Sequence, residues 1–554
     1  MIVKTEEGRI KVISKGADSI IEKRLKKGQH HLATTKEFLD DFAKTGLRTL
    51  LVVQKEISQA EYDTWSEAYL QASVSRKKDE EMAKVADELE TEFELLGSTA
   101  IEDKLQEDVG NTIYDIRQAG IKVWVLTGDK IETAMNIGYA CRLLDETMNT
   151  FMLTSLEEKA VADEIAKASE EQKHTEQAGD NAVVVAGETL ALIKKNKDLE
   201  SSFVKLCENA NVVLACRVSP KQKAEVVLMI KTRNPAKTTL AIGDGANDVN
   251  MITAAHIGIG ISGFEGQQAV KASDYAIGKF KYLKNLLFVH GREAYRRNSF
   301  ATVFIFYKNI LGTSPIFFFG IWSIFSGSLI YHLTLYNGFN PFFTSLPIVW
   351  ISTMDFEHPK AKLLSEPALY KYGIRNLLFN YKIFAREIFY GFGQALLISV
   401  FSLYAFSIGS QSVDGKYGGY TEAGDFIFIC LVILVNTRVL VSSHTIDWGL
   451  IAVEVVSFLV YLLFAIVISW FFYFDDQYHS YQHIFQFPMT YFALFIFITV
   501  FSAIDRLITV IRRFRKRIAL DRLNAEIAAK AAQENEVSRN LSRQNSVVPC
   551  KWTD

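Results

Sequence analysis

The segment Gly243-Asp-Gly-Ala-Asn-Asp248 places two carboxylates and one amide within five residues. It follows the apolar run Thr239–Ile242, which we expect to be a buried strand, and its glycines allow the backbone to turn sharply. Open parallel α/β sheets bind ligands in the loops at the carboxyl ends of their strands. Clustered oxygen atoms in such a loop suit Mg²⁺ and a phosphoryl group, although a solvated acidic turn has the same composition.

Two further loops with polar side chains follow strand-like runs earlier in the chain. Thr127-Gly-Asp-Lys130 comes directly after the run 122–126, and Arg217-Val-Ser-Pro220 with Lys223 comes after the run 211–216. Helical patterns follow both loops. Short apolar strands that alternate with helices predict an α/β fold with a doubly wound parallel sheet. Its expected strands are 122–126, 181–186, 211–216, 239–242 and 257–261.

Residues 1–95 have a different pattern, which predicts the end of a separate α+β domain. The run Arg9–Ile13 alternates like an exposed sheet strand, and Lys15-Gly-Ala-Asp18 opens a helix. Gly46-Leu-Arg-Thr49 precedes another expected strand at 50–53. Taken singly, Lys15, Arg48 and Arg217 would be read as solvated surface charges.

Composition divides the chain of 554 residues into two parts. Up to about Tyr282 the sequence is charged and mixed, whereas Phe, Ile, Leu and Val dominate from about Phe300 to Thr509. Stretches of about 20 apolar residues predict membrane-spanning helices. We expect an all-α bundle of six spans, near 299–322, 337–356, 382–408, 424–444, 448–473 and 488–511.

Basic residues predict the orientation of these spans. The connection 357–386 and the start of the tail, Arg512–Arg517, are rich in Lys and Arg, whereas the connections 331–340 and 475–486 contain none. By the positive-inside rule both ends of the chain are expected in the cytosol. The polar stretch 538–554 is expected to be disordered.

Several classes of protein are excluded by composition. The first half has no basic stripe interleaved with aromatic residues, so we expect no nucleic-acid partner. The five cysteines have no CxxC spacing, which argues against zinc and disulfides. The net charge of −2 averages two unlike halves and says nothing about partners.

In order along the chain, these motifs resemble those of a P-type ATPase of the lipid-flipping (type IV) class, from about residue 1 to 517. Asp103-Lys-Leu-Gln106 and Val123-Trp-Val-Leu-Thr-Gly-Asp-Lys130 carry the resemblance to the flippase class in particular. The resemblance implies four regions. These are the end of a nucleotide-binding domain (1–95), a haloacid dehalogenase-like phosphorylation domain (96–290), the transmembrane domain (291–511) and a cytosolic tail (512–554).

The resemblance also implies ATP and Mg²⁺ as cofactors and a role for each motif. Lys15, Arg48 and Arg217 would contact the nucleotide. Thr127, Gly128 and Asp129 would hold the transferred phosphoryl group, and Lys223 would neutralise its charge. Asp244 and Asp248 would ligate Mg²⁺, with Asn247 and Asp248 completing the phosphate shell. On the residues alone, Thr127-Gly-Asp could simply cap the following helix.

One feature of the family is missing from this sequence. The family forms a covalent phosphate on the aspartate of an Asp-Lys-Thr-Gly motif, and the nearest match here is Ala43-Lys-Thr-Gly46. The dephosphorylation motif Asp-Gly-Glu-Thr and the family's first four spans are also missing. The chain is therefore expected to be the C-terminal half of a flippase, a truncated record being favoured over a natural half-protein, and to be inactive alone.

The expected first span carries Tyr307-Lys308-Asn309 midway and no acidic residue. A cation pump would place carboxylates there, whereas a lysine and an amide suit a phospholipid headgroup, so these three residues are predicted to lie on a lipid path. Lys308 could instead snorkel or pair with an acid. The family's Asp-Gln-Asp is Asp355-Phe-Glu357 here, which weakens any role given to those two positions.

The resemblance further implies a small accessory glycoprotein subunit. The alternatives to a flippase are a cation-transporting P-type pump, a haloacid dehalogenase-type phosphatase, against which the six spans argue, and a membrane scaffold that binds nucleotide without turnover.

Overall fold

A computed structural model describes residues 1–29, 31–44, 47–75, 78–101, 105–175, 180–263, 266–406, 411–415, 417–471 and 478–545. The chain divides into two compact units. The first contains Met1–Arg117, Ile121–Leu283 and Val537–Asp554, and the second contains Gln118–Gly120 and Lys284–Glu536.

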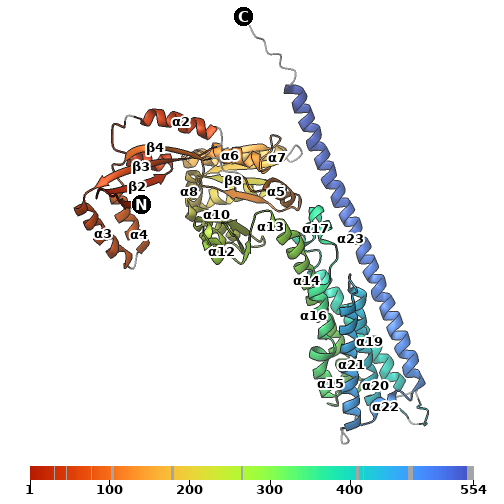
Figure 1. Cartoon of the computed structure of the whole chain (residues 1–554). Coiled ribbons are helices and arrows are strands. Elements are labelled where there is room, and N and C mark those ends of the chain that lie inside the picture. Colours follow the sequence, from red (N-terminus) through yellow and green to blue (C-terminus); the bar gives the residue numbers. More distant parts are fainter. Residues whose placement is uncertain are drawn as a thin grey trace. The chain divides into compact units, whose positions relative to one another are not determined.

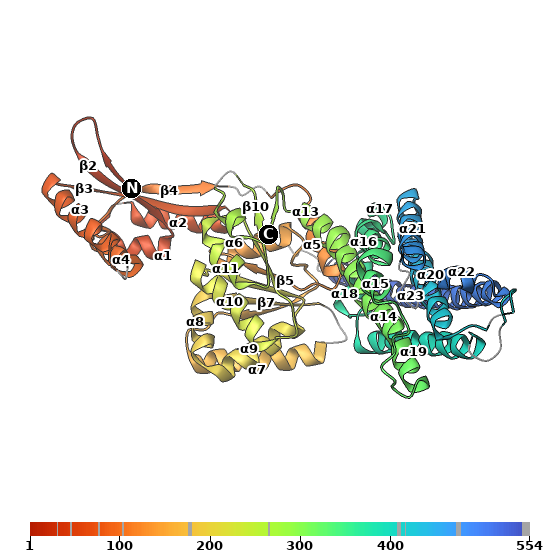
Figure 2. The same cartoon turned by 90° about the horizontal axis from the view of Figure 1, so that it is seen from below.

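The first unit begins with a four-stranded antiparallel sheet in the order β1-β2-β3-β4. The strands are β1 (Ile2–Lys4), β2 (Ile10–Gly16), β3 (Arg48–Ile57) and β4 (Glu94–Ile101). Its apolar side includes Val12, Leu51 and Val53, on alternating positions of two paired strands. The accompanying helices, some of which Figure 2 shows beside the sheet, are α1 (Asp18–Ile21), α2 (Leu32–Lys44), α3 (Gln59–Ser73) and α4 (Lys78–Leu89).

The parallel strands form two sheets, where one doubly wound sheet was expected. The first has the order β5-β8-β7-β6 and the second the order β11-β10-β9. Among the described residues, β5 pairs only with β8 and β9 only with β10, so no ladder joins the two sheets. The strands are β5 (Val123–Leu126), β6 (Asn149–Leu153), β7 (Asn181–Ala186), β8 (Val212–Cys216), β9 (Leu240–Gly243), β10 (Ile257–Ile261) and β11 (Tyr275–Ile277).

Strands β7 and β8 are buried on both faces, which explains why they are continuously apolar. Val183 and Val213 belong to one apolar core, whereas their neighbours Val184 and Leu214 belong to another. The helices of this region are α5 (Val109–Gln118), α6 (Ile131–Ala140), α7 (Glu158–Thr175), α8 (Gly187–Lys195), α9 (Lys197–Asn209), α10 (Pro220–Arg233), α11 (Val249–Ala254) and α12 (Gln268–Ala272).

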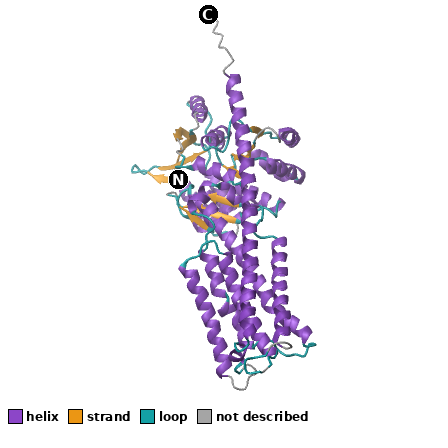
Figure 3. Cartoon of the chain, turned by 90° about the vertical axis from the view of Figure 1, so that its right-hand side faces the viewer, coloured by secondary structure: helices purple, strands orange, loops and turns teal. Residues whose placement is uncertain are grey.

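In the second unit all regular elements of the described residues are helices, shown in purple in Figure 3. Five helical segments are long and apolar enough to span a membrane, namely 282–322, 381–404, 420–442, 448–471 and 488–515. They belong to α14 (Arg292–Trp322) with the short α13 (Tyr282–Lys284) and the π-helical η3 (Asn285–Gly291), α19 (Tyr381–Tyr404), α20 (Tyr420–Ser442), α21 (Trp448–Phe471) and α23 (Pro488–Asn545). Figure 1 shows these helices beside one another. Shorter helices are α17 (Lys360–Ser365), α18 (Lys371–Ile374) and α22 (Ser480–Ile484).

The expected span 337–356 is not one continuous helix. It is divided into α15 (Leu333–Gly338), the π-helical turn η4 (Phe339–Phe343) and α16 (Ser345–Met354). Pro341 and Pro347 have no backbone N–H, so the usual ladder of helical hydrogen bonds cannot run through this segment. The segment is therefore not among the five long apolar helices.

The tail also differs from expectation. Disorder was expected from residue 538, but α23 continues without interruption from the apolar segment to Asn545. Residues 546–554 lie outside the described part of the chain.

Candidate functional site

The loop after β5 is held together by its own side chains. The hydroxyl of Thr127 donates to a carboxylate oxygen of Asp129 at 2.6 Å, and the backbone N–H of Asp129 donates back to that hydroxyl at 3.2 Å. The N-cap of α6 is Lys130, and it has no side-chain cap. The hydroxyl of Thr127 therefore orders the loop and does not cap the helix.

Backbone hydrogen bonds join this loop to the loop after β8. The N–H of Arg217 donates to the carbonyl of Asp129 at 3.0 Å, and that of Val218 donates to the carbonyl of Thr127 at 3.0 Å. Arg217 has a φ of +53°, a conformation that is uncommon for residues other than glycine, and its side chain is exposed. Gly187 lies against the backbone of Arg217, and a Cβ atom at Gly187 would be 2.3 Å from the Arg217 carbonyl oxygen.

Helix α10 follows the loop after β8, and its side chains reach the loop after β9. Ser219 and Gln222 form a capping box that fixes the start of α10. One turn in, the ammonium of Lys223 is 2.8 Å from a carboxylate oxygen of Asp248. The three motifs thus lie in loops at the carboxyl ends of parallel strands, and hydrogen bonds and one ion pair connect these loops.

The remaining predicted residues of this loop are open to solvent. Asp244 and Asn247 are exposed and Asp248 is half-buried. Within the described residues no group of three or more His, Cys, Asp or Glu side chains could hold a metal ion. Two carboxylates are nevertheless enough for Mg²⁺, which usually keeps several waters and takes its other ligands from substrate phosphates.

A thiol nucleophile is excluded at this site. Cys216 ends β8 beside the loops, but burial, reinforced by the charge of Asp129, raises the pKa of its thiol to about 12. The thiol therefore stays protonated near neutral pH, which makes it a poor nucleophile.

Of the three predicted nucleotide contacts, Lys15 and Arg48 lie on the antiparallel sheet, whereas Arg217 lies in the loop after β8. Lys15 is exposed and pairs with Val52 across β2 and β3, while Arg48 is the first residue of β3, four positions before Val52. The side chain of Arg48 lies outside the described part of the structure. An ion pair of 2.7 Å between Asp18 and Lys130, which no local pattern predicted, ties the Lys15 motif to the end of the loop after β5.

In the second unit, three consecutive residues of α14 lie in three different environments. The hydroxyl of Tyr307 donates to Gln394 on α19 at 2.6 Å, Lys308 donates to the hydroxyl of Thr344 at 2.9 Å, and Asn309 is exposed. Successive residues of a helix point about 100° apart, so one face cannot carry all three. The structure does not bring this predicted trio together.

Lys308 is almost completely buried, at 4% exposure. No carboxylate of the described residues lies within ion-pair distance of it, and its hydrogen-bond partner is a neutral hydroxyl. The pairing with an acid and the snorkelling that the sequence left open are therefore not observed in the described part of the chain.

Several other buried charges of the second unit are paired. Glu387 on α19 accepts from Arg438 on α20 and from Arg512 on α23, and Arg386 is 3.0 Å from it. The guanidinium of Arg438 also lies 3.7 Å above the ring of Tyr307. The sequence marked Arg386 and Arg512 only as basic residues at the ends of spans. It did not indicate the pairing with Glu387, because a single charge in an apolar helix does not reveal its partner.

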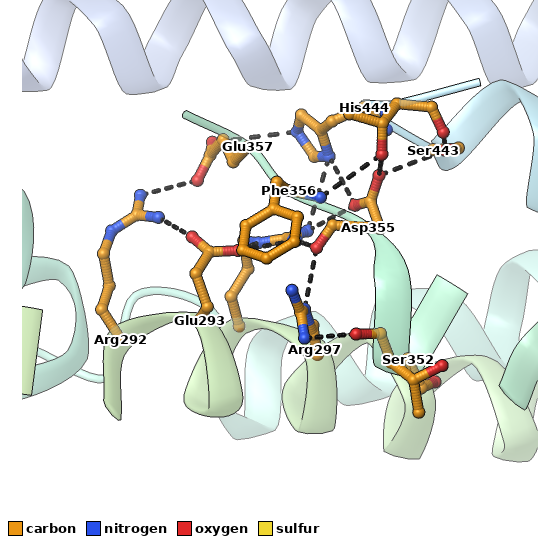
Figure 4. Close-up of polar contacts among 12 residues, drawn as sticks. Arg292, Glu293, Arg297, Ser352, Asp355, Phe356, Glu357, Ser443 and His444 are labelled. Carbon is orange, nitrogen blue, oxygen red and sulfur yellow. Dashed lines mark hydrogen bonds and ion pairs between the residues drawn. The ribbon is translucent and has the colours of Figure 1, made fainter. Parts of the chain in front are cut away.

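A second network lies where α14 approaches the end of α16 (Figure 4). Asp355 accepts from Arg296 at 2.8 Å and from the backbone N–H groups of His444 and Thr445 at 2.8 and 2.9 Å. Arg292 donates to Glu357 at 2.6 Å. Asp355 and Glu357 thus hold loops and helix ends together.

The parallel sheets, the joined motif loops and the long apolar helices fit the C-terminal region of a P-type ATPase. A family model described as "Phospholipid-translocating P-type ATPase C-terminal" matches residues 270–517. This part of the chain therefore matches the C-terminal part of phospholipid-translocating P-type ATPases.

Named relatives are similar over most of this chain. Phospholipid-transporting ATPase 6 of Arabidopsis thaliana is 38% identical over 84% of the chain and 39% of its own length. Phospholipid-transporting ATPase DNF1 of Saccharomyces cerevisiae is 38% identical over 80% of the chain and 30% of its own length. Phospholipid-transporting ATPase ID of Homo sapiens is 37% identical over 82% of the chain and 40% of its own length. The chain thus spans two fifths or less of these relatives.

Proposed function

We propose that this chain is the C-terminal half of an ATP-driven flippase that moves phospholipid from the outer or lumenal leaflet to the cytosolic leaflet. The observation that carries the proposal is Lys308, a buried cation on a membrane helix without a carboxylate partner among the described residues. Such a group is costly in a bilayer and marks a transport path. It repels metal cations and suits the phosphate of a lipid headgroup, in keeping with the names of the relatives.

The first unit would supply the phosphoryl chemistry, with ATP and Mg²⁺ as cofactors, in a haloacid dehalogenase-like domain over residues 96–290. Thr127, Gly128 and Asp129 would hold the phosphoryl group, Lys223 would balance its charge, and Asp244 would bind Mg²⁺. Asn247 and Asp248 would complete this shell. Lys15, Arg48 and Arg217 would contact the nucleotide, Lys15 and Arg48 from the part of its domain that ends near residue 95. The ties between the loops after β5, β8 and β9 support this assignment.

The second unit would form six spans within 291–511, the interrupted segment α15-η4-α16 being the second of them. Both ends of the chain, including the tail from residue 512, would then lie in the cytosol, because Lys and Arg flank the spans on that side. A small accessory glycoprotein would accompany the complete flippase. The lipid path would include Lys308, with Tyr307 and Asn309 on neighbouring faces of α14.

A non-catalytic, nucleotide-binding scaffold is the second candidate. It is favoured by one observation, that Asp-Lys-Thr-Gly does not occur in the 554 residues. Incubation of the purified chain with labelled ATP and Mg²⁺ tests catalysis directly. We expect no acid-stable, hydroxylamine-sensitive label, because the acceptor carboxylate is missing. A labelled band would contradict this expectation.

The transport half of the proposal is tested in a full-length relative that carries the same motif. Replacement of the lysine that matches Lys308 by alanine is expected to abolish uptake of fluorescent phospholipid at normal expression. Replacement of the residue that matches Lys360, which is exposed outside the long apolar helices, is the control. Unchanged uptake in the first variant would refute the role of Lys308.

A further inference from the structure

The buried lysine is held from a break in the neighbouring membrane segment. Thr344 is fully buried at the junction between η4 and α16. Its hydroxyl donates to the carbonyl of Phe339 at 2.7 Å and accepts from the ammonium of Lys308 at 2.9 Å. Because its single proton is committed to Phe339, the hydroxyl turns a lone pair toward Lys308.

The break is itself tied to a third helix. Pro347 lies in the first turn of α16 and has no N–H, so it cannot donate to the carbonyl of Phe343 four residues earlier. The side-chain amide of Asn436 on α20 donates to this carbonyl at 3.2 Å. Asn436 is only 6% exposed. A buried backbone acceptor is thus satisfied from another helix, and the residue before Thr344 is fixed in place.

Close packing leaves little freedom at this point. Gly312 lies one turn after Lys308 on α14, and a Cβ atom there would be 3.0 Å from the ring of Phe339. The ring of Phe343 lies 5.4 Å from those of both Tyr461 and Phe464. Lys308 and Thr344 are therefore in contact among apolar side chains, where a hydrogen bond to a charged group is stronger than in water.

We propose that Thr344 and Asn436 are positioning residues for Lys308: the hydroxyl of Thr344 holds the ammonium, and the amide of Asn436 holds the segment that carries Thr344. This inference rests on the proposed role of Lys308 in binding phospholipid. A lysine ammonium has three N–H donors, and one is used by Thr344 in the described structure. Within the described residues the ammonium has no second acceptor, so its other two N–H groups would be the donors to the phosphate of a headgroup.

The test measures binding of a fluorescent phosphatidylcholine to the purified chain in detergent micelles, with the matching diacylglycerol as a probe that lacks phosphate. Lys308→Ala is expected to weaken binding of the phosphatidylcholine at least tenfold and to leave the diacylglycerol unchanged. Thr344→Val keeps the shape of the side chain but removes the hydroxyl, and it is expected to weaken binding about tenfold. Thr344→Ser, which retains the hydroxyl, is expected to bind like the parent chain.

A double-mutant cycle separates positioning from general damage. If Thr344 acts through Lys308, Lys308→Ala with Thr344→Val binds no more weakly than Lys308→Ala alone. Asn436→Leu is expected to weaken binding several-fold by the same route and serves as the second variant if Thr344→Val does not fold. Thr353→Val on α16 is the matched control, because within the described part of the chain that hydroxyl bonds only to carbonyls of its own helix.

The outcomes distinguish the two proposals. If Lys308→Ala binds phosphatidylcholine normally, the proposed function fails. If Lys308→Ala weakens binding but folded Thr344→Val and Asn436→Leu bind like the parent chain, Lys308 binds lipid and the positioning inference fails. A further loss on adding Thr344→Val to Lys308→Ala would also overturn it, because Thr344 would then act independently of the lysine.

Discussion

The two units fix their polar residues in different ways. In the first unit the loops that carry Thr127 and Arg217 are joined by backbone hydrogen bonds, and charged groups such as Asp244 remain open to solvent. In the second unit charged side chains fix one another, as Glu387 does with Arg438. Exposed charges of this kind suit the phosphate site that we propose for the first unit, whereas a charge buried among apolar helices needs a partner.

Lys308 differs from the paired charges of the second unit. It is as buried as Arg438 but has a neutral hydroxyl in place of a carboxylate among the described residues. The second unit thus follows the rule for buried charges with Glu387 and Asp355. It departs from the rule at Lys308 on α14 and at Glu454 on α21, a buried carboxylate without an ion-pair partner among the described residues. The following predictions test that comparison through stability, beginning with the largest expected change.

Replacement of Glu387 by alanine is expected to have the largest effect. It leaves the buried guanidinium of Arg438, which is 6% exposed, without its main partner. Removal of one partner of a buried ion pair destabilises a protein by about 3–5 kcal/mol. Thermal unfolding of the purified chain in detergent micelles would measure the loss.

Arg386→Ala is the matched control, because Arg386 contacts the same carboxylate from a half-exposed position. Exposed ion pairs contribute about 1 kcal/mol or less. If Arg386→Ala and Glu387→Ala lower stability equally, the second unit is not held by its buried charges.

Gly187→Ala is expected to have the next largest effect. The added Cβ atom would lie 2.3 Å from the carbonyl oxygen of Arg217, and backbone atoms cannot move aside as a flexible side chain can. Overpacking of this kind destabilises by about 1–3 kcal/mol. Gly278→Ala is the control, since its nearest neighbour is a side-chain atom at 4.0 Å. Equal melting temperatures of the two variants would show that backbone packing does not hold the first site.

The sequence predicted the parts of this fold that depend on local patterns. Continuous apolar runs at 181–186 and 211–216 indicated strands buried on both faces, and the structure has β7 and β8 there. Long apolar stretches indicated five of the spans. The loops after β5 and β8 were also predicted, because a loop at the end of an apolar strand can be recognised from neighbouring residues alone.

What the sequence did not predict depends on contacts between distant residues. The separation of β5 from β9 follows from strand pairing, which the pattern of either strand does not encode. The interruption at η4 could have been suspected from Pro341 and Pro347, which lie six residues apart in one apolar stretch. Helical periodicity places Tyr307, Lys308 and Asn309 on different faces of α14, so the sequence alone could have shown that they do not share one environment.

Lys308→Leu is expected to leave stability unchanged to within about 1 kcal/mol or to raise it. Replacement of a buried charge by an apolar side chain of similar size removes a desolvation cost and loses only the bond to Thr344. The free energy of unfolding is measured by thermal unfolding and compared with that of Glu387→Ala. Glu387→Ala removes the partner of a buried charge, whereas Lys308→Leu removes a buried charge that has no carboxylate partner in the described structure. A loss of about 3 kcal/mol or more would mean that Lys308 is part of the structural charge network.

Lys223→Ala is expected to have the smallest effect. Its ion pair with Asp248 is only partly buried, with side-chain exposures of 15% and 13%, and water can solvate the remaining carboxylate. Because the loop is fixed by backbone contacts, we expect a loss of about 1 kcal/mol or less. Lys221→Ala, on the exposed side of α10, is the control in the same thermal assay. If Lys223→Ala destabilised the chain as strongly as Glu387→Ala, the lysine would be a structural residue, and the first unit would depend on its charges just as the second does.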